Sequence, residues 1–270
     1  PSIPVAIVFI VLFFSTTAYH CWQAFTKRTF YFIPLIIGRV FEWTGYIVRI
    51  LAHFHIHSMA IYVAQTLLLL LPPSLFAASV YMVLGCLILY TKGESVAPIR
   101  ANWLTKIFVT GDVFTFIVQA VGNGSVLAES STRNLGKKVV IVGLALQIIF
   151  FGIFIITSAI SHRRIASTPT SASLQAPWQK YLWTLYVASS LILIRSIFRS
   201  FEFAEGDNGK LVSNEVILYA FDAALMLGVM VVFHVVHPEE LIGRKGVSNG
   251  EAPLAELEGG NESVVTGEIR

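Results

Sequence analysis

Residues 30–52 read FYFIPLIIGRVFEWTGYIVRILA, a stretch long and apolar enough to cross a bilayer that nevertheless contains Arg39, Glu42 and Arg49. A helix needs about 20 apolar residues to span a hydrocarbon core of about 30 Å. A charge within such a helix costs roughly 2.5–3.5 kcal/mol on insertion scales. We therefore expect these charged side chains to face the interior of a helical bundle, where they pair with one another or contact a substrate.

The composition of the chain favours an integral membrane protein. Of its 270 residues, 55% are hydrophobic and 13% are charged, and the mean hydropathy is +0.72. A soluble domain carries roughly 25% charged residues. The net charge of +3 is small and the basic residues are scattered, so the sequence indicates no nucleic-acid partner.

Seven apolar stretches are long enough for membrane helices, so we predict an all-α polytopic membrane protein with seven transmembrane helices. They cover residues 3–23, 30–52, 58–90, 103–122, 137–160, 180–199 and 215–236. The third contains Pro72 and Pro73, and we expect one helix kinked there, because a turn would leave backbone groups unsatisfied in lipid. The first could instead be the core of a signal peptide, but it lacks a basic region, which favours a retained helix.

The distribution of basic residues predicts the orientation. When helix ends are assigned alternately to the two sides of the membrane, nine Lys and Arg residues fall on one side and five on the other. The richer side is expected to be cytosolic, which places the N-terminus outside and the C-terminus in the cytosol. We predict a transmembrane domain over residues 1–240 and a disordered cytosolic tail over residues 241–270, where Gly and Glu are frequent. The plasma membrane is the expected location.

Helical spacing arranges the polar residues in stripes. Arg39, Glu42, Tyr46 and Arg49 follow steps of three, four and three, so they share one helix face. Three further stretches show such stripes, which lipid cannot solvate, so we expect all four to meet in a shared interior. The further stripes comprise Gln65, Pro72, Ser79 and Cys86; Asp112, Thr115 and Gln119; and Glu215, Tyr219, Asp222 and Met226.

Two interpretations of the buried charges stay open. The arginines and carboxylates nearly balance in number, so they could pair with one another and fix the register of the helices. A seven-helix bundle can, however, pack with Gly, Ala and Ser alone. For the set as a whole this favours a functional role, although for any single residue structural pairing is the simpler interpretation.

Several motifs follow one another in a specific order along the apolar region. They are Gly38-Arg39, residues 42–46 and Arg49; Gln65, Leu71-Pro72-Pro73 and residues 77–81; residues 108–113 and Gln119; Gly143-Leu144 and Gln147; residues 193–202; and Glu215, Tyr219, Phe221-Asp222 and His237-Pro238. In this order they resemble the fungal lipid-translocating exporter family, named for resistance to aminocholesterol. One departure is Cys86, at a position where the family leads us to expect a basic residue.

The resemblance implies a transporter of amphiphiles rather than an enzyme. Members of the family resemble exporters of sphingoid long-chain bases, tolerance factors for toxic amphiphiles and a porphyrin transporter. The expected partners are therefore membrane lipids or amphiphilic small molecules. The chain contains no Gly-x-x-x-x-Gly-Lys-Ser/Thr loop, so we expect no ATP hydrolysis, and we predict no cofactor.

A sphingoid base joins a cationic amine to a long alkyl chain, so its head group needs a carboxylate partner. Glu42, Asp112 and Asp222 lie deepest in their stretches and are the best candidates. Arg39, Arg49 and Arg195 could hold these carboxylates ionised, and Arg199, Glu202 and Glu215 are expected to form a gate near the outer boundary. The predicted substrate-binding set is Arg39, Glu42, Tyr46, Arg49, Gln65, Asp112, Gln119, Arg195, Arg199, Glu202, Glu215, Tyr219 and Asp222.

Two other classes of protein fit parts of the sequence. A seven-helix receptor or sensor of lipids or sterol-like compounds would have the same gross topology, but charged stripes on several helices favour transport. An intramembrane metal hydrolase is suggested by His53, His55, His57, His234 and His237. Their spacing matches neither the HExxH motif nor a helical i, i+4 pair, so we predict no metal site.

Two smaller features complete the expectations. Cys21 and Cys86 lie in or beside apolar runs, where free thiols are expected rather than a disulfide. The segment Gly122-Asn123-Gly124 is typical of a helix stop.

Overall fold

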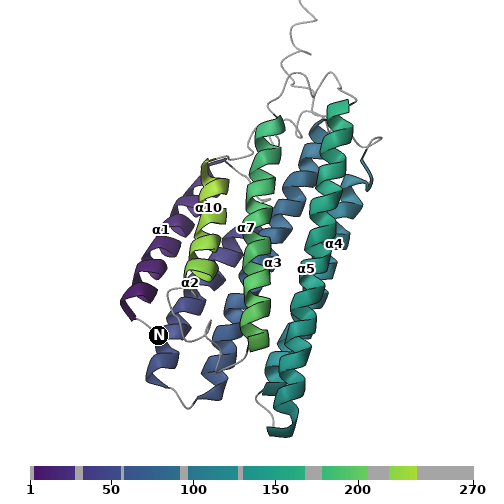
Figure 1. The fold of residues 1–270 in the computed structure, drawn as a ribbon. Helices are drawn as coiled ribbons and strands as arrows, with labels where there is room; N and C mark the ends of the chain where they lie inside the picture. The colour runs from purple at the N-terminus through teal and green to yellow at the C-terminus, as the bar shows by residue number, and fades with distance from the viewer. Residues whose placement is uncertain are drawn as a thin grey trace, which may run out of the picture.

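The computed structural model describes residues 3–27, 33–55, 58–91, 97–126, 130–167, 178–205 and 219–235. Within these ranges every regular element is helical, which confirms the predicted all-α class (Figure 1). The elements are α1 (Ile3–Lys27), α2 (Ile33–Phe54), α3 (Met59–Tyr90), α4 (Ala101–Val126), α5 (Ser130–Ser167), α7 (Trp178–Glu205), the π-helix η2 (Tyr219–Ala224) and α10 (Leu225–Val235). Because η2 runs directly into α10, each of the seven predicted stretches contains one helical rod.

Most of these rods have the length and composition of membrane helices. Five helices, namely α1, α3, α4, α5 and α7, are long and apolar enough to cross a bilayer. The remaining rods differ for clear reasons: α2 carries three charged residues, and the last apolar stretch, Phe221–Val235, is short. The chain is therefore an integral membrane protein of several spans, while a total of seven crossings and the orientation of the termini stay predictions.

The helices form a closed circuit of contacts, and α3 is the most buried of the five spanning helices. Contacts join α1 to α2, α2 to α3, α3 to α4, α4 to α5, α5 to α7, α7 to α10 and α10 to α1, and α3 also packs against α7. Figure 1 shows α1 and α10 at one side of the bundle and α4 and α5 at the other. The spanning window of α3 is 72% buried, against 56% or less in the other four spanning helices. The charges of α2 and α7 therefore face a protein interior built around α3.

Helix α3 stays continuous through Pro72 and Pro73, which confirms the single helix predicted there. Proline has no backbone N–H, so Pro73 cannot donate to the carbonyl of Leu69 four residues earlier. The Nη2 atom of Arg195, on α7, donates to that carbonyl oxygen at 2.6 Å. A side chain of a neighbouring helix thus satisfies the backbone group that the proline leaves free, as a low-dielectric interior requires.

The segment Gly122-Asn123-Gly124 does not end a helix, and the prediction of a stop there was wrong. Helix α4 continues through it to Val126. A Cβ atom on Gly122 would lie 2.7 Å from Cγ2 of Val140 and 2.9 Å from the carbonyl oxygen of Gly136. The glycine is therefore explained by the close approach of α4 and α5 rather than by a left-handed cap.

This packing gives a direct test of the α4–α5 interface. Gly122→Ala forces a methyl group into α5, and overpacking of this kind costs about 1–3 kcal/mol. Gly124→Ala is the matched control, because its Cβ would meet nothing within 4 Å. We expect the first variant to lower the thermal unfolding temperature of the detergent-solubilised protein and the second to maintain or raise it. Equal effects of the two substitutions would contradict the close contact.

Some predictions fall on residues outside the described ranges. These are the predicted tail over residues 241–270, the site residue Glu215, and His57, His237 and Pro238. Both cysteines are described: Cys21 is half-buried and Cys86 is buried, and no disulfide joins them.

Candidate functional site

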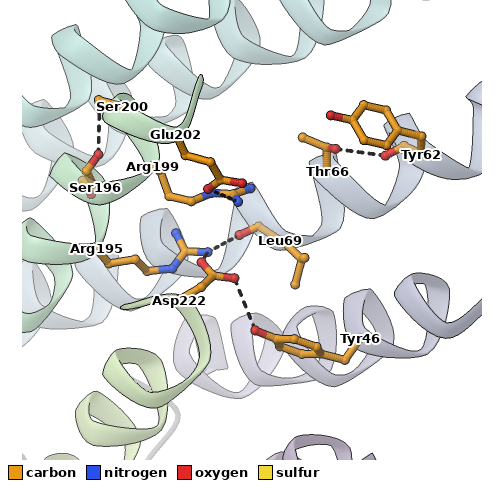
Figure 2. Close-up of polar contacts among 10 residues, drawn as sticks. All are labelled: Tyr46, Tyr62, Thr66, Leu69, Arg195, Ser196, Arg199, Ser200, Glu202 and Asp222. Carbon is orange, nitrogen blue, oxygen red and sulfur yellow. Dashed lines mark hydrogen bonds and ion pairs between the residues drawn. The ribbon is translucent and has the colours of Figure 1, made fainter. Parts of the chain in front are cut away.

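The centre of the bundle contains a buried ion pair between two helices. The Nη2 atom of Arg195, on α7, lies 2.7 Å from Oδ1 of Asp222 in η2, and the two side chains are 2% and 0% exposed. This contact lacks the alignment of a hydrogen bond. The hydroxyl of Tyr46, on α2, donates to Oδ2 of Asp222 at 3.3 Å. Figure 2 shows these side chains converging from three elements, with Leu69 of α3 beside them.

Asp222 lies in the π-helical segment that precedes α10. A π-helix closes its hydrogen bonds between residues five apart, and such turns occur frequently at functional sites. Tyr219 and Asp222 both belong to this segment and are 3% and 0% exposed. The irregular turn therefore directs two predicted site residues toward the interior together.

A second ion pair lies on α7 beside the first. The Nη1 atom of Arg199 donates to Oε2 of Glu202 at 2.7 Å, and the Glu202 side chain is 13% exposed. The guanidinium carbon of Arg199 also lies 5.6 Å from the ring centroid of Phe203. This pair is more accessible than Arg195 and Asp222, which agrees with a position nearer the edge of the bundle.

Glu42 is the exceptional member of the site. It is 0% exposed, and neither carboxylate oxygen has a hydrogen-bond partner among the residues that the structure describes. It interacts electrostatically with Arg195, Asp222 and Arg199. Buried carboxylates are normally hydrogen-bonded, so two oxygens of Glu42 that are buried without a described partner indicate capacity for a ligand. We call Glu42, Tyr46, Arg195, Arg199, Glu202 and Asp222 the central cluster.

Aromatic rings border the central cluster on the side of α1. Phe9 stacks on Tyr219 with ring centroids 5.7 Å apart, and Tyr46 lies 6.0 Å from the same ring. The guanidinium carbon of Arg49 lies 5.2 Å from the Tyr219 centroid, within the range of a cation–π interaction. Arg49 was expected to hold a carboxylate ionised, but its described contact is with an aromatic ring.

Arg39 was also expected to hold a carboxylate ionised, but its described hydrogen bond is to a backbone carbonyl. Its Nη1 atom donates to the backbone carbonyl oxygen of Thr16 on α1 at 3.2 Å. Arg39 and Glu42 share a face of α2, yet the electrostatic partners of Arg39 are Cys21 and His234. Its side chain therefore contacts a different part of the bundle from the central cluster.

The predicted stripe on α4 faces α3 and α5. The Tyr81 hydroxyl of α3 donates to Oδ2 of Asp112 at 2.8 Å. Gln119 donates through Nε2 to Oε1 of Gln147 on α5 at 2.9 Å, and Gln147 donates to Ser74 at 3.3 Å. Within the described ranges no hydrogen bond or ion pair joins this stripe to the central cluster, so the stripes of α2 and η2 meet each other and the stripe of α4 lies apart from them.

Sequence reasoning missed several partners, and one predicted site residue, Gln65, stays a prediction. Tyr81 and Ser74 were overlooked as partners because a single hydroxyl in an apolar helix resembles ordinary core. The contact between His234 and His20 also gave no signal, since their spacing in sequence is large. Gln65 is half-buried on α3, one turn before Leu69.

A bundle of apolar helices around a buried ion pair defines a polytopic α-helical membrane protein. The sequence model of the family described as RTA1 like protein matches residues 35–245. The chain therefore belongs to the RTA1-like family, which confirms the resemblance drawn from its motifs.

Several yeast proteins are similar to this chain. Protein RTM1 of Saccharomyces cerevisiae is 38% identical over 203 residues, covering 75% of this chain and 65% of that protein. Protoporphyrin uptake protein 1 of S. cerevisiae is 39% identical over 215 residues, covering 78% and 69%. Sphingoid long-chain base transporter RSB1 of S. cerevisiae is 25% identical over 275 residues, covering 88% and 72%. The chain thus spans about two thirds of the length of the first two, and none of the solved structures matches it.

The bond from Arg195 to the Leu69 carbonyl predicts a coupling between two distant positions. Arg195→Met removes the donor and leaves a buried carbonyl unsatisfied, which costs about 1–3 kcal/mol. Pro73→Ala supplies a backbone N–H four residues after Leu69. We therefore expect Arg195→Met to cost about 1–3 kcal/mol less in the Pro73→Ala background than in the wild-type protein, measured by unfolding in detergent.

Pro72→Ala is the control for this cycle. It restores a donor to the carbonyl of Leu68, to which the described contacts of Arg195 do not extend. The cost of leaving Asp222 without its partner is the same in every background and cancels. An equal coupling of Arg195 to both prolines would contradict the assigned bond.

Proposed function

We propose that this chain translocates cationic amphiphiles, such as sphingoid long-chain bases, and that Glu42 accepts the head group. The observation that carries the proposal is the fully buried Glu42 carboxylate without a hydrogen-bond donor among the described residues. Membership of the RTA1-like family supports a membrane transporter, and one relative is named for transport of sphingoid long-chain bases.

The ammonium group of such a base suits Glu42 in charge and in hydrogen bonding. An ammonium has three donors and no acceptor, and a carboxylate is acceptor-only. Each unsatisfied oxygen of Glu42 would receive a charge-assisted bond, which offsets part of the cost of removing the amine from water. Arg195 pairs with Asp222 and is held in place by the Leu69 carbonyl. This pairing would keep the Asp222 carboxylate from competing with Glu42 for the same amine.

The alkyl chain would stay outside the protein interior. Large apolar side chains cover the outer faces of the helices, and examples are Phe14 at 57%, Ile117 at 53% and Val121 at 61% exposure. An alkyl chain that lies against these apolar faces stays in a hydrocarbon environment. Only the polar head group therefore needs a route through the bundle. Glu42 and Tyr46, separated by a rise of about 6 Å along α2, would provide polar contacts for the head group within that route.

The proposal includes the predicted topology. Seven crossings with an outside N-terminus and a cytosolic C-terminus would place the pair of Arg199 and Glu202 toward the outer surface. That pair, which is accessible at Glu202, would then act as the outer gate of the head-group route. Residence in the plasma membrane and tolerance of toxic amphiphiles follow as expectations.

Glu42→Gln separates transport from folding. The substitution keeps the shape of the side chain and breaks no bond that the described residues make with it. We expect uptake of a fluorescent long-chain base into proteoliposomes to fall about tenfold or more, as expected for loss of a charge-assisted hydrogen bond. The thermal unfolding temperature of the purified variant should not fall.

Glu205→Gln is the matched control, because this carboxylate is exposed at the last residue of α7, whereas Glu42 is fully buried. It should transport at the wild-type rate. Wild-type transport by Glu42→Gln, in a protein shown to be folded, would overturn the assigned head-group contact.

The related variant Asp222→Asn should reduce transport without changing the amount of protein at the cell surface. Loss of both transport and surface protein would indicate a structural role for Asp222.

A further inference from the structure

A second polar group lies at the junction of α1, α2 and α10, apart from the central cluster. It consists of Arg39, the backbone carbonyl of Thr16, His20 and His234, and we call it the Arg39 site. We propose that the Arg39 site binds the oxyanion, carboxylate or phosphate, of an anionic amphiphile. This inference goes beyond the proposed function, which concerns cationic head groups and Glu42.

Arg39 is a buried cation that forms no ion pair with a carboxylate of the described residues. Its side chain is 0% exposed, and its one described hydrogen bond is from Nη1 to the carbonyl oxygen of Thr16. Within the described ranges no carboxylate forms an ion pair with it. A buried charge is normally paired, because removing it from water is costly. An anion is therefore the missing partner that the environment of Arg39 favours.

The free edge of the guanidinium has the geometry that oxyanions prefer. Nε and Nη2 of Arg39 both lack a partner among the described residues. Their N–H bonds point in parallel from one edge of the planar group, while Nη1 lies on the far side and is occupied by Thr16. Parallel N–H pairs of this kind bind carboxylate and phosphate in a bidentate manner.

Two imidazoles add donor capacity near Arg39. Nδ1 of His234 lies 3.1 Å from Nε2 of His20, so the rings share one proton, and Arg39 interacts electrostatically with His234. The Tyr19 ring covers His234 with centroids 4.1 Å apart. The group thus joins positive and neutral donors, and Arg39 interacts with the Cys21 thiol but with no described carboxylate, which suits an anion and disfavours a cation.

The depth of the site favours a lipid anion over a free one. Arg39 lies six residues into α2 from its first residue, Ile33, a rise of about 9 Å along the helix. The outer faces of α1 and α10 carry exposed apolar side chains, including Val8, Val11 and Val231. An acyl chain can lie against these faces while its head group reaches the guanidinium, whereas inorganic phosphate would have to leave water unaided.

The test uses the full chain in nanodiscs and three probes. These are oleoyl lysophosphatidic acid, the neutral monooleoyl glycerol with the same tail, and inorganic phosphate. We expect lysophosphatidic acid to raise the thermal unfolding temperature and to bind in calorimetry, and monooleoyl glycerol to do neither. Stabilisation by inorganic phosphate alone would support the oxyanion site and identify its ligand as a soluble anion. If neither lysophosphatidic acid nor inorganic phosphate stabilises the protein, the proposal is overturned. This part of the test uses only the wild-type protein.

Variants then assign the binding to Arg39. Arg39→Gln should weaken lysophosphatidic acid binding about tenfold or more, and Arg39→Lys, which keeps the charge but loses the fork, should also weaken it. Arg163→Gln, which removes an exposed arginine of α5, should bind as the wild type does. Unchanged affinity in a folded Arg39→Gln variant would contradict the site. Glu42→Gln should bind lysophosphatidic acid with wild-type affinity. The binding experiment and the transport assay for the proposed function can therefore fail independently.

Discussion

The structure depends on one arginine that satisfies two needs at once. Pro73 leaves the Leu69 carbonyl without its helical donor, and Arg195 donates to it while pairing with Asp222. Helices α3, α7 and η2 are thereby joined at a single guanidinium in the interior. An unsatisfied carbonyl and an unpaired carboxylate would each be costly there, so the three elements stabilise one another's irregularities.

This arrangement divides the buried charges into those that are balanced and those that are not. Arg195 and Arg199 form ion pairs with carboxylates. Glu42 and Arg39 form no ion pair with any described residue. The unpaired acid faces α7 and η2, and the unpaired base faces α1 and α10. Both belong to α2, which for this reason combines strongly polar positions with an otherwise apolar surface and separates two regions of opposite electrostatic preference.

Much of the fold was predictable because hydropathy and helical period are local properties of the chain. The spans and the inward stripe on α2 follow from them, as Glu42 and Tyr46 confirm by their complete burial. Pairing was not predictable, because it depends on which helices become neighbours. Asp112 was expected beside Glu42 and instead contacts Tyr81, and Gly122 was expected to end α4 and instead admits α5.

The π-helical turn of η2 limits how the chain can vary in length. In an α-helix each residue advances the side-chain direction by about 100°. The loss of one residue between Asp222 and α10 would therefore turn Asp222 away from Arg195 relative to α10, while the apolar contacts of α10 are retained. A change that barely alters hydropathy would then separate the ion pair, so this short segment should tolerate exchange of side chains far better than insertion or deletion of residues.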